Sequence, residues 1–188
     1  GVMALDPATG KPAWAHAARG AYAGEPLAVT LGDQKTVLVT RGGEVRDAAD
    51  GTLLLDAAPV LGAWDWFAMT ASGETLYSAW EGGRAAAELL LDADGQVGLR
   101  PLWRGERLHA YTAGGPNPCV RADGRLFVWR RVPEHAKHCP AYLLQVDWYD
   151  ADSGLHGGWI KRVLRGTNRT ADPVVAGNYL FCPDHRGG

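Results

Sequence analysis

The residues best suited to metal chemistry lie in one short stretch in the second half of the chain. His135 and His138, with Cys139 directly after them, are ligand types for zinc or copper. Their spacing completes no four-ligand pattern, and Pro133 and Pro140 frame the stretch as a solvated loop between two strands. The sequence predicts a surface loop, with a metal or contact site at His135, His138 and Cys139 as the alternative.

Recognised catalytic motifs are absent from the sequence. It holds no G-x-S-x-G, H-E-x-x-H, G-x-x-x-x-G-K-[ST] or G-x-G-x-x-G pattern. The glycine pairs Gly82-Gly83 and Gly114-Gly115 are typical of turns between strands rather than of phosphate-binding loops. Catalytic residues are therefore unassigned, and the pattern favours a protein that is not an enzyme.

Charge and hydropathy exclude two classes of partner. The 188 residues include 19 Lys and Arg and 21 Asp and Glu, a net charge of −2. Such a chain has no strong positive field, so nucleic acid is not an expected partner. No stretch approaches the roughly 20 apolar residues of a membrane-spanning helix. The three cysteines, Cys119, Cys139 and Cys182, form no C-x-x-C; free thiols are expected, with one disulfide plus one thiol as the alternative.

One turn pattern recurs along the chain and must position any functional loop. An apolar segment runs into Asp, passes through two or three residues that often end in Thr, Ser or Asp, and reaches Gly. The Asp carboxylate suits a backbone N–H two residues later, and Gly supplies the positive φ of a short hairpin. The four copies are Asp6–Gly10, Asp47–Gly51, Asp92–Gly95 and Asp150–Gly154.

The spacing of these corners gives the size of the repeating unit. Their glycines are 41, 44 and 59 residues apart, and the last interval holds the insert 132–140. A second type of hairpin lies between the corners, most clearly at residues 118–129 and 173–182. Two hairpins every 40 to 50 residues is the size of a four-stranded propeller blade. No run of helical periodicity long enough for a helical solenoid is present.

These residues resemble a known family. Residues 2–14 (VMALDPATGKPAW) resemble the repeat of the PQQ-like (pyrroloquinoline-quinone-type) β-propellers, and residues 173–181 resemble the hairpin that precedes it in each blade. The resemblance covers nearly the whole chain and weakens between Gly51 and Trp103. It implies an all-β propeller of four-stranded antiparallel blades. The family includes quinoprotein dehydrogenases and also cofactor-free propellers, such as the scaffold lipoprotein of bacterial outer-membrane protein assembly.

The resemblance also implies the division of the chain. It gives one propeller segment with a half blade at 1–20, repeats at about 21–62, 63–110 and 111–166, and a half blade at 167–188. That makes about four blade equivalents, which we expect to be a fragment of a larger ring of seven or eight blades. The alternative is that the two half blades pair with each other and close a four-bladed ring.

Tryptophans of this family pack between neighbouring blades. Trp14 and Trp103 lie in last strands of their blades, and Trp159 follows Gly154 much as Trp14 follows Gly10. The resemblance implies that all three pack in this way. Burial of such large rings stabilises a fold by a few kcal/mol.

A quinoprotein of this family would need calcium ligands and a carboxylate base with an arginine beside it. No spacing joins the candidate residues into one site, and adjacent paired cysteines are absent. No cofactor is therefore assigned; PQQ and calcium belong to the alternative function only. The candidate residues, all near loops, are Asp65, Asn117, Asn168, Arg169, Asp172 and Arg186.

The sequence therefore predicts a non-enzymatic binding or scaffold module that presents propeller loops to a protein or small ligand, and that contacts the remaining blades of its parent chain. The first alternative is a segment of a PQQ- and calcium-dependent alcohol or sugar dehydrogenase. The second is a propeller sensor domain of a larger signalling protein. The resemblance, with a composition typical of bacteria, implies the periplasm or cell envelope.

Overall fold

The computed structural model describes residues 1–17, 26–32, 35–62, 68–80, 83–105, 119–133, 142–162, 174–177 and 179–181. In these ranges the chain is all-β, with sixteen strands and one four-residue helix. Every strand pair is antiparallel. The predicted fold class, antiparallel four-stranded blades, is confirmed.

The strands form three complete sheets of four strands, in which each strand pairs with the next along the chain. Sheet 1 contains β3 (Leu27–Leu31), β4 (Lys35–Val39), β5 (Glu44–Asp47) and β6 (Leu53–Asp56). Sheet 2 contains β7 (Ala68–Ser72), β8 (Thr75–Trp80), β9 (Gly83–Leu91) and β10 (Val97–Gly105). Sheet 3 contains β11 (Cys119–Ala122), β12 (Arg125–Pro133), β13 (Tyr142–Asp150) and β14 (His156–Arg162).

Two hairpins flank the complete sheets. The N-terminal hairpin pairs β1 (Val2–Leu5) with β2 (Pro12–His16), and the C-terminal hairpin pairs β15 (Val174–Ala176) with β16 (Tyr179–Phe181). Each is a separate two-stranded sheet. In the described residues these two hairpins therefore do not pair with each other, as the alternative of a closed four-bladed ring required.

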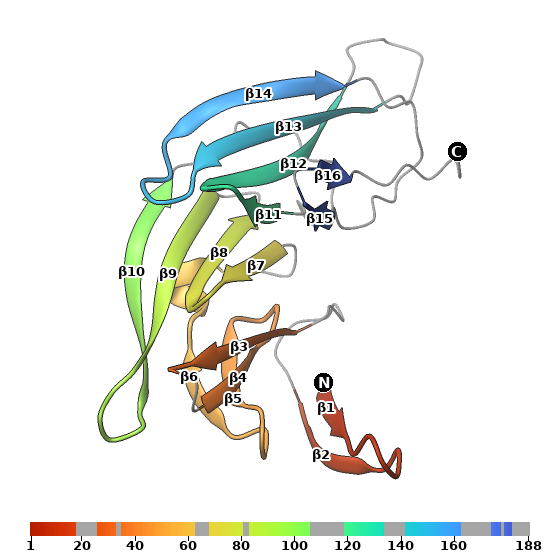
Figure 1. Ribbon diagram of the computed structural model, residues 1–188, viewed down its shortest axis with the longest axis vertical. Coiled ribbons are helices and arrows are strands. Elements are labelled where there is room, and N and C mark those ends of the chain that lie inside the picture. The colour runs from red at the N-terminus through yellow and green to blue at the C-terminus, as the bar shows by residue number, and fades with distance from the viewer. Residues whose placement is uncertain are drawn as a thin grey trace.

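The sheets follow one another in an open arc (Figure 1). Their first strands are neighbours, since β3 contacts β7, β7 contacts β11, and β11 contacts β15. The last strands, such as β10 and β14, lie on the outer side of the arc (Figure 1). The first strand of each sheet lies inside the arc and the last strand lies outside, which is the radial order of the strands in propeller blades.

The strands form where buried and exposed side chains alternate, because the buried ones pack on the neighbouring sheet. Val29, Leu31, Val37 and Val39 of sheet 1 are buried, while Thr30 between them is exposed. Together with Leu76, Ala87 and Leu89 of sheet 2 they form one core. A second core joins sheets 2 and 3, with Tyr77, Ala79 and Ala86 against Leu126, Val128 and Tyr149.

Sheet 2 is covered on both faces because it lies between the other two sheets. The buried run Ala85–Ala87 shows how the sequence allows this, since small side chains on both faces of β9 let each neighbour approach closely. β8 likewise reads as a continuous buried strand from Leu76 to Trp80. The helix α1 (Ala58–Leu61) connects sheets 1 and 2 and ends at Gly62, which has φ +68° and packs under the Trp80 ring. Within the described ranges, no helix is long and apolar enough to cross a membrane.

Candidate functional site

The corner aspartates act as turn residues. Asp6 Oδ1 accepts a hydrogen bond from the Ala8 backbone N–H at 2.8 Å, and Asp47 Oδ1 accepts the equivalent bond from Ala49 at 2.9 Å. Asp92 Oδ1 accepts the equivalent bond from Asp94, and Asp150 Oδ1 accepts one from the Ser153 backbone N–H, three residues later. The predicted role in turn geometry is confirmed.

Two tryptophans join one blade to the corner of the next. The Trp14 indole Nε1–H donates to Ala48 O at 3.1 Å, and the Trp103 indole donates to Ala151 O at 2.8 Å. Ala48 and Ala151 each follow the Asp of their corner by one residue. The predicted packing of Trp14 and Trp103 between neighbouring blades is confirmed.

The corner glycines allow the Trp14 and Trp103 rings to lie close to the backbone of the neighbouring corner. A Cβ at Gly51 would lie 2.6 Å from the Trp14 ring, and one at Gly154 would lie 2.6 Å from the Trp103 ring. The corner Gly therefore has two duties: it adopts positive φ, +76° and +69° here, and it leaves room for the indole. The two joints use the same contact.

Trp159 does not make this contact, and its predicted packing between blades is wrong for the described residues. It pairs with Asp147 on β13, whereas Trp14 pairs with Ala4, two residues before the corner Asp. Both hairpins have the same register shift before the corner Asp, so Gly158, four residues after Gly154, holds the position of Trp14, and Trp159 comes one residue later. The Trp159 side chain consequently lies on the other face of its strand and is exposed.

At the joint between sheets 1 and 2, the residue equivalent to Trp14 is Leu55, because each follows its corner Gly by four residues. Next to this joint lies an open cleft of about 530 Å³ between the corner of sheet 1 and the β9–β10 turn. Lys35 Nζ lies 3.2 Å from Asp47 Oδ2 in its wall. The cleft is lined by Lys35, Thr36, Asp47, Ala48, Ala49, Leu91 and Gly95.

The cleft offers one ammonium, one carboxylate, one hydroxyl and several small apolar groups. This mixture suits an extended peptide, whose backbone groups and small side chains need both polar and apolar contacts. Sequence reasoning missed the cleft because its walls come from two different sheets, which no local pattern joins.

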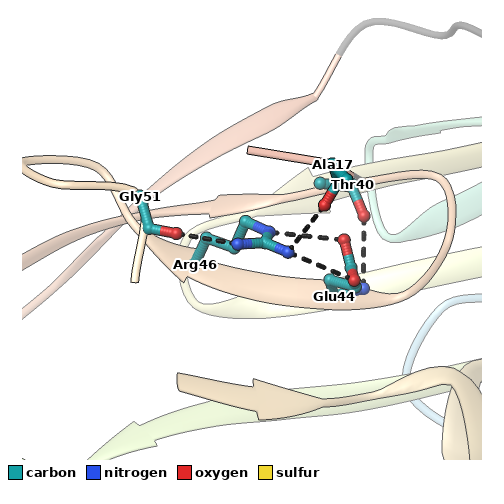
Figure 2. A network of polar contacts seen from close by, with 5 residues as sticks. All are labelled: Ala17, Thr40, Glu44, Arg46 and Gly51. Carbon is teal, nitrogen blue, oxygen red and sulfur yellow. Dashed lines mark hydrogen bonds and ion pairs between the residues drawn. The ribbon is translucent and has the colours of Figure 1, made fainter. Parts of the chain in front are cut away.

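A buried polar network fastens the N-terminal hairpin to sheet 1 (Figure 2). Glu44 and Arg46 form an ion pair at 3.3 Å with both side chains almost completely buried. Arg46 also donates to Gly51 O at 2.8 Å and to Ala17 O at 3.1 Å, and Thr40 Oγ1 accepts the Glu44 backbone N–H. Every charged group of the pair thus has a partner, which is the condition for tolerating buried charge.

Sheets 2 and 3 are joined by a second charged contact. The Arg84 guanidinium lies 4.0 Å from the Tyr149 ring centroid and donates to Gly154 O from Nη2 at 2.9 Å. Burial lowers the pKa of Arg84 and raises the pKa of Tyr77 nearby.

The residues predicted as a weak metal site, His135, His138 and Cys139, lie outside the described residues. So do the quinone and calcium candidates Asp65, Asn117, Asn168, Arg169, Asp172 and Arg186. In the ranges that are described, no three His, Cys, Asp or Glu side chains lie close enough to hold a metal ion. Cys119 is buried and its Sγ lies 3.5 Å from Ala68 O; Cys139 and Cys182 are outside the described residues.

Comparison with known proteins gives structural likenesses only. No family model matches the chain, and no curated protein matches it. Among solved structures it is similar to BamB from Moraxella catarrhalis, with a TM-score of 0.45 and 16% sequence identity over 97% of this chain. The chain spans 60% of the length of that structure.

Proposed function

We propose that this chain is a segment of a β-propeller of the PQQ-like repeat type and serves as a non-enzymatic binding or scaffold module. In this proposal residues 1–20 and 167–188 are half blades, and the repeats lie at about 21–62, 63–110 and 111–166. The observation that carries it is the recurring joint, in which Trp14 and Trp103 make the same contact with the corner of the next sheet. Such joints hold successive sheets at fixed positions.

A rigid frame of this kind supports binding at its loops and clefts. The polar groups that could have suggested chemistry in the described residues are engaged in the frame itself: the corner aspartates in turns, and Glu44 with Arg46 in a buried pair. The cleft beside Lys35 and Asp47 is the surface on which we place a protein partner. The sequence resemblance supports the bacterial periplasm or cell envelope as its location.

The proposal is tested against the dehydrogenase alternative by titrating the 188-residue chain with calcium and pyrroloquinoline quinone. Isothermal titration calorimetry measures binding, and a dye-linked assay with ethanol and glucose measures oxidation. We expect no stoichiometric binding and no turnover above the chain-free control. Binding of one quinone per chain, together with dye reduction that requires calcium, would refute the scaffold function and establish the alternative.

A further inference from the structure

The corners of the three complete sheets share one sequence feature, an alanine directly after the corner Asp. In sheets 1 and 3 the carbonyl oxygen of this alanine, Ala48 or Ala151, accepts the indole N–H of a tryptophan from the preceding hairpin or sheet. In sheet 2 the corresponding residue is Ala93. The chain therefore makes the same contact twice: one ring and one N–H donor are held on one corner.

The corner of sheet 2 is bare where the other two are covered. Gly51 and Gly154 are buried beneath tryptophan rings, whereas a Cβ at Gly95 would meet nothing within 4 Å. Ala93 and Gly95 are both exposed. Leu55, in the last strand of sheet 1, packs against the core between sheets 1 and 2 and does not cover this corner. Sheet 2 lies between two complete sheets, so its corner is bare although the sheet has a neighbour on each side.

The open cleft between sheets 1 and 2 adjoins this bare corner. Its volume is about 530 Å³, and it extends from the corner of sheet 1 to Gly95. That size lies within the range of about 300–1,000 Å³ that is typical of ligand pockets. The cleft opens on the side of the corner that faces the preceding sheet, which is the side from which Trp14 and Trp103 reach their corners. Leu91 and two alanines of the sheet 1 corner supply apolar surface for a ring.

The two corners that border the cleft are acidic. They contain Asp47, Asp50, Asp92 and Asp94, while Lys35 is the one cation among the described residues that line the cleft. Lys35 Nζ lies 3.2 Å from Asp47 Oδ2, so it already neutralises one of these carboxylates. The remaining excess of negative charge favours a cationic partner.

We infer that the cleft receives a tryptophan of a partner protein, in a segment where a lysine or arginine is next to that tryptophan. The ring packs on the bare corner at Gly95, its indole N–H donates to Ala93 O, and the adjacent cation faces Asp92 and Asp94. A phenylalanine or leucine would fill the cleft without supplying the N–H donor that the other two corners receive. The inference rests on the proposed binding function and supplies the chemistry of the partner.

The test uses the 188-residue chain and short peptides with acetylated and amidated ends. NMR titration of the isotope-labelled chain with Lys-Trp-Lys should shift the amide signals of Ala93 and Gly95 and give a dissociation constant. Lys-Ala-Lys should bind about tenfold more weakly or worse, because it lacks the ring. Lys-Phe-Lys, which keeps a ring without the N–H, should bind about threefold to tenfold more weakly than Lys-Trp-Lys.

Three variants test the place of binding. Gly95→Ala puts a methyl group where the ring would lie and should weaken Lys-Trp-Lys binding about tenfold or more. Gly124→Ala is the matched control and should leave binding unchanged, because Gly124 also has positive φ and nothing within 4 Å but does not line the cleft. Asp94→Lys, at an exposed position, should weaken the binding of Lys-Trp-Lys and strengthen that of Glu-Trp-Glu.

Equal affinity for Lys-Trp-Lys and Lys-Ala-Lys, or equal binding by the parent chain and Gly95→Ala, would overturn the inference. A loss of folding stability in Gly95→Ala well beyond that in Gly124→Ala would also overturn it, because the corner would then be covered within the chain itself. These results leave the scaffold function untouched, since that function is refuted by quinone binding with calcium-dependent dye reduction. The two proposals therefore fail separately.

Discussion

At the scale of single residues, the corner aspartates fix the turns and the tryptophans join neighbouring sheets. Asp6 and Asp150 accept hydrogen bonds that fix their turns, and their partners lower the pKa of both carboxyls. For Asp6 the main cause is the Ala8 backbone N–H, and for Asp150 it is the Ser153 hydroxyl. Trp103 contributes both a large ring and one N–H donor to the joint between sheets 2 and 3.

The corner carboxylates predict how stability depends on pH. Because the pKa of Asp6 and of Asp150 is lower in the folded chain than the ordinary 3.8, the unfolded chain takes up protons first as pH falls. Their contribution is therefore present above pH 3.8 and is lost as pH falls below it through the folded pKa values. Changing both residues to Asn, which keeps an acceptor oxygen, should make the free energy of unfolding less dependent on pH in this range. Urea titrations at several pH values measure it; an unchanged slope would contradict the assignment.

Two substitutions at Trp103 separate the contribution of the indole N–H donor to stability from that of the ring. Trp103→Phe removes the hydrogen bond to Ala151 O and should cost about 1–2 kcal/mol, and Trp103→Ala also removes the ring and should cost about 3–4 kcal/mol. Leu102→Ala on the same strand, where the side chain is largely exposed, is the control and should cost under about 1 kcal/mol. Urea unfolding followed by circular dichroism measures all three. Equal losses at positions 102 and 103 would show that the indole does not join the sheets.

At the scale of elements, the N-terminal hairpin is fixed to sheet 1 by one arginine. Arg46 on β5 contacts Glu44 on its own strand, Gly51 in the corner and Ala17 at the end of the hairpin (Figure 2). The Trp14 indole also holds the hairpin, through Ala48 O, and His16 Nε2 lies 3.2 Å from Asp50 O. The hairpin is therefore part of the frame, although its β1 edge is unpaired in the described residues.

Replacement of Arg46 should lower the free energy of unfolding substantially. Arg46→Met leaves Glu44 buried without its cation and should reduce the free energy of unfolding by about 3–5 kcal/mol. Lys35→Met, which breaks the half-exposed pair with Asp47, is the matched control and should cost about 1 kcal/mol or less. Chemical denaturation of both variants measures the difference. If Arg46→Met costs no more than Lys35→Met, the network does not fasten the hairpin.

Sequence patterns predicted some elements and missed others for physical reasons. The corners follow from a local pattern of Asp and Gly, and this pattern places Trp14 and Trp103 in last strands, four and eight residues after their corner glycines. The prediction for Trp159 is wrong because Trp159 follows its corner Gly by five residues and Trp14 by four, and an offset of one residue places a side chain on the other face of its strand. The Glu44–Arg46 network depends on a carbonyl 29 residues away at Ala17, which no local pattern encodes.

At the scale of the whole molecule, the account depends on successive sheets being held face to face by equivalent joints. Two of the joints use tryptophan, while the joint between sheets 1 and 2 has Leu55 at the equivalent position and a cleft beside it. The arc in Figure 1 has a two-stranded hairpin at each end.

The most direct measurement is hydrogen exchange at the indole N–H groups, followed by NMR in the parent chain and in Gly→Ala variants. The account predicts slow exchange at Trp14 and Trp103, because each donates to the corner of the next sheet. Gly154→Ala should expose Trp103 alone, and Gly51→Ala should expose Trp14 alone, since the added methyl displaces the ring above it. Gly95→Ala, where nothing lies within 4 Å, should expose neither. Unprotected exchange at both indoles in the parent chain would contradict the stacking of the sheets as blades.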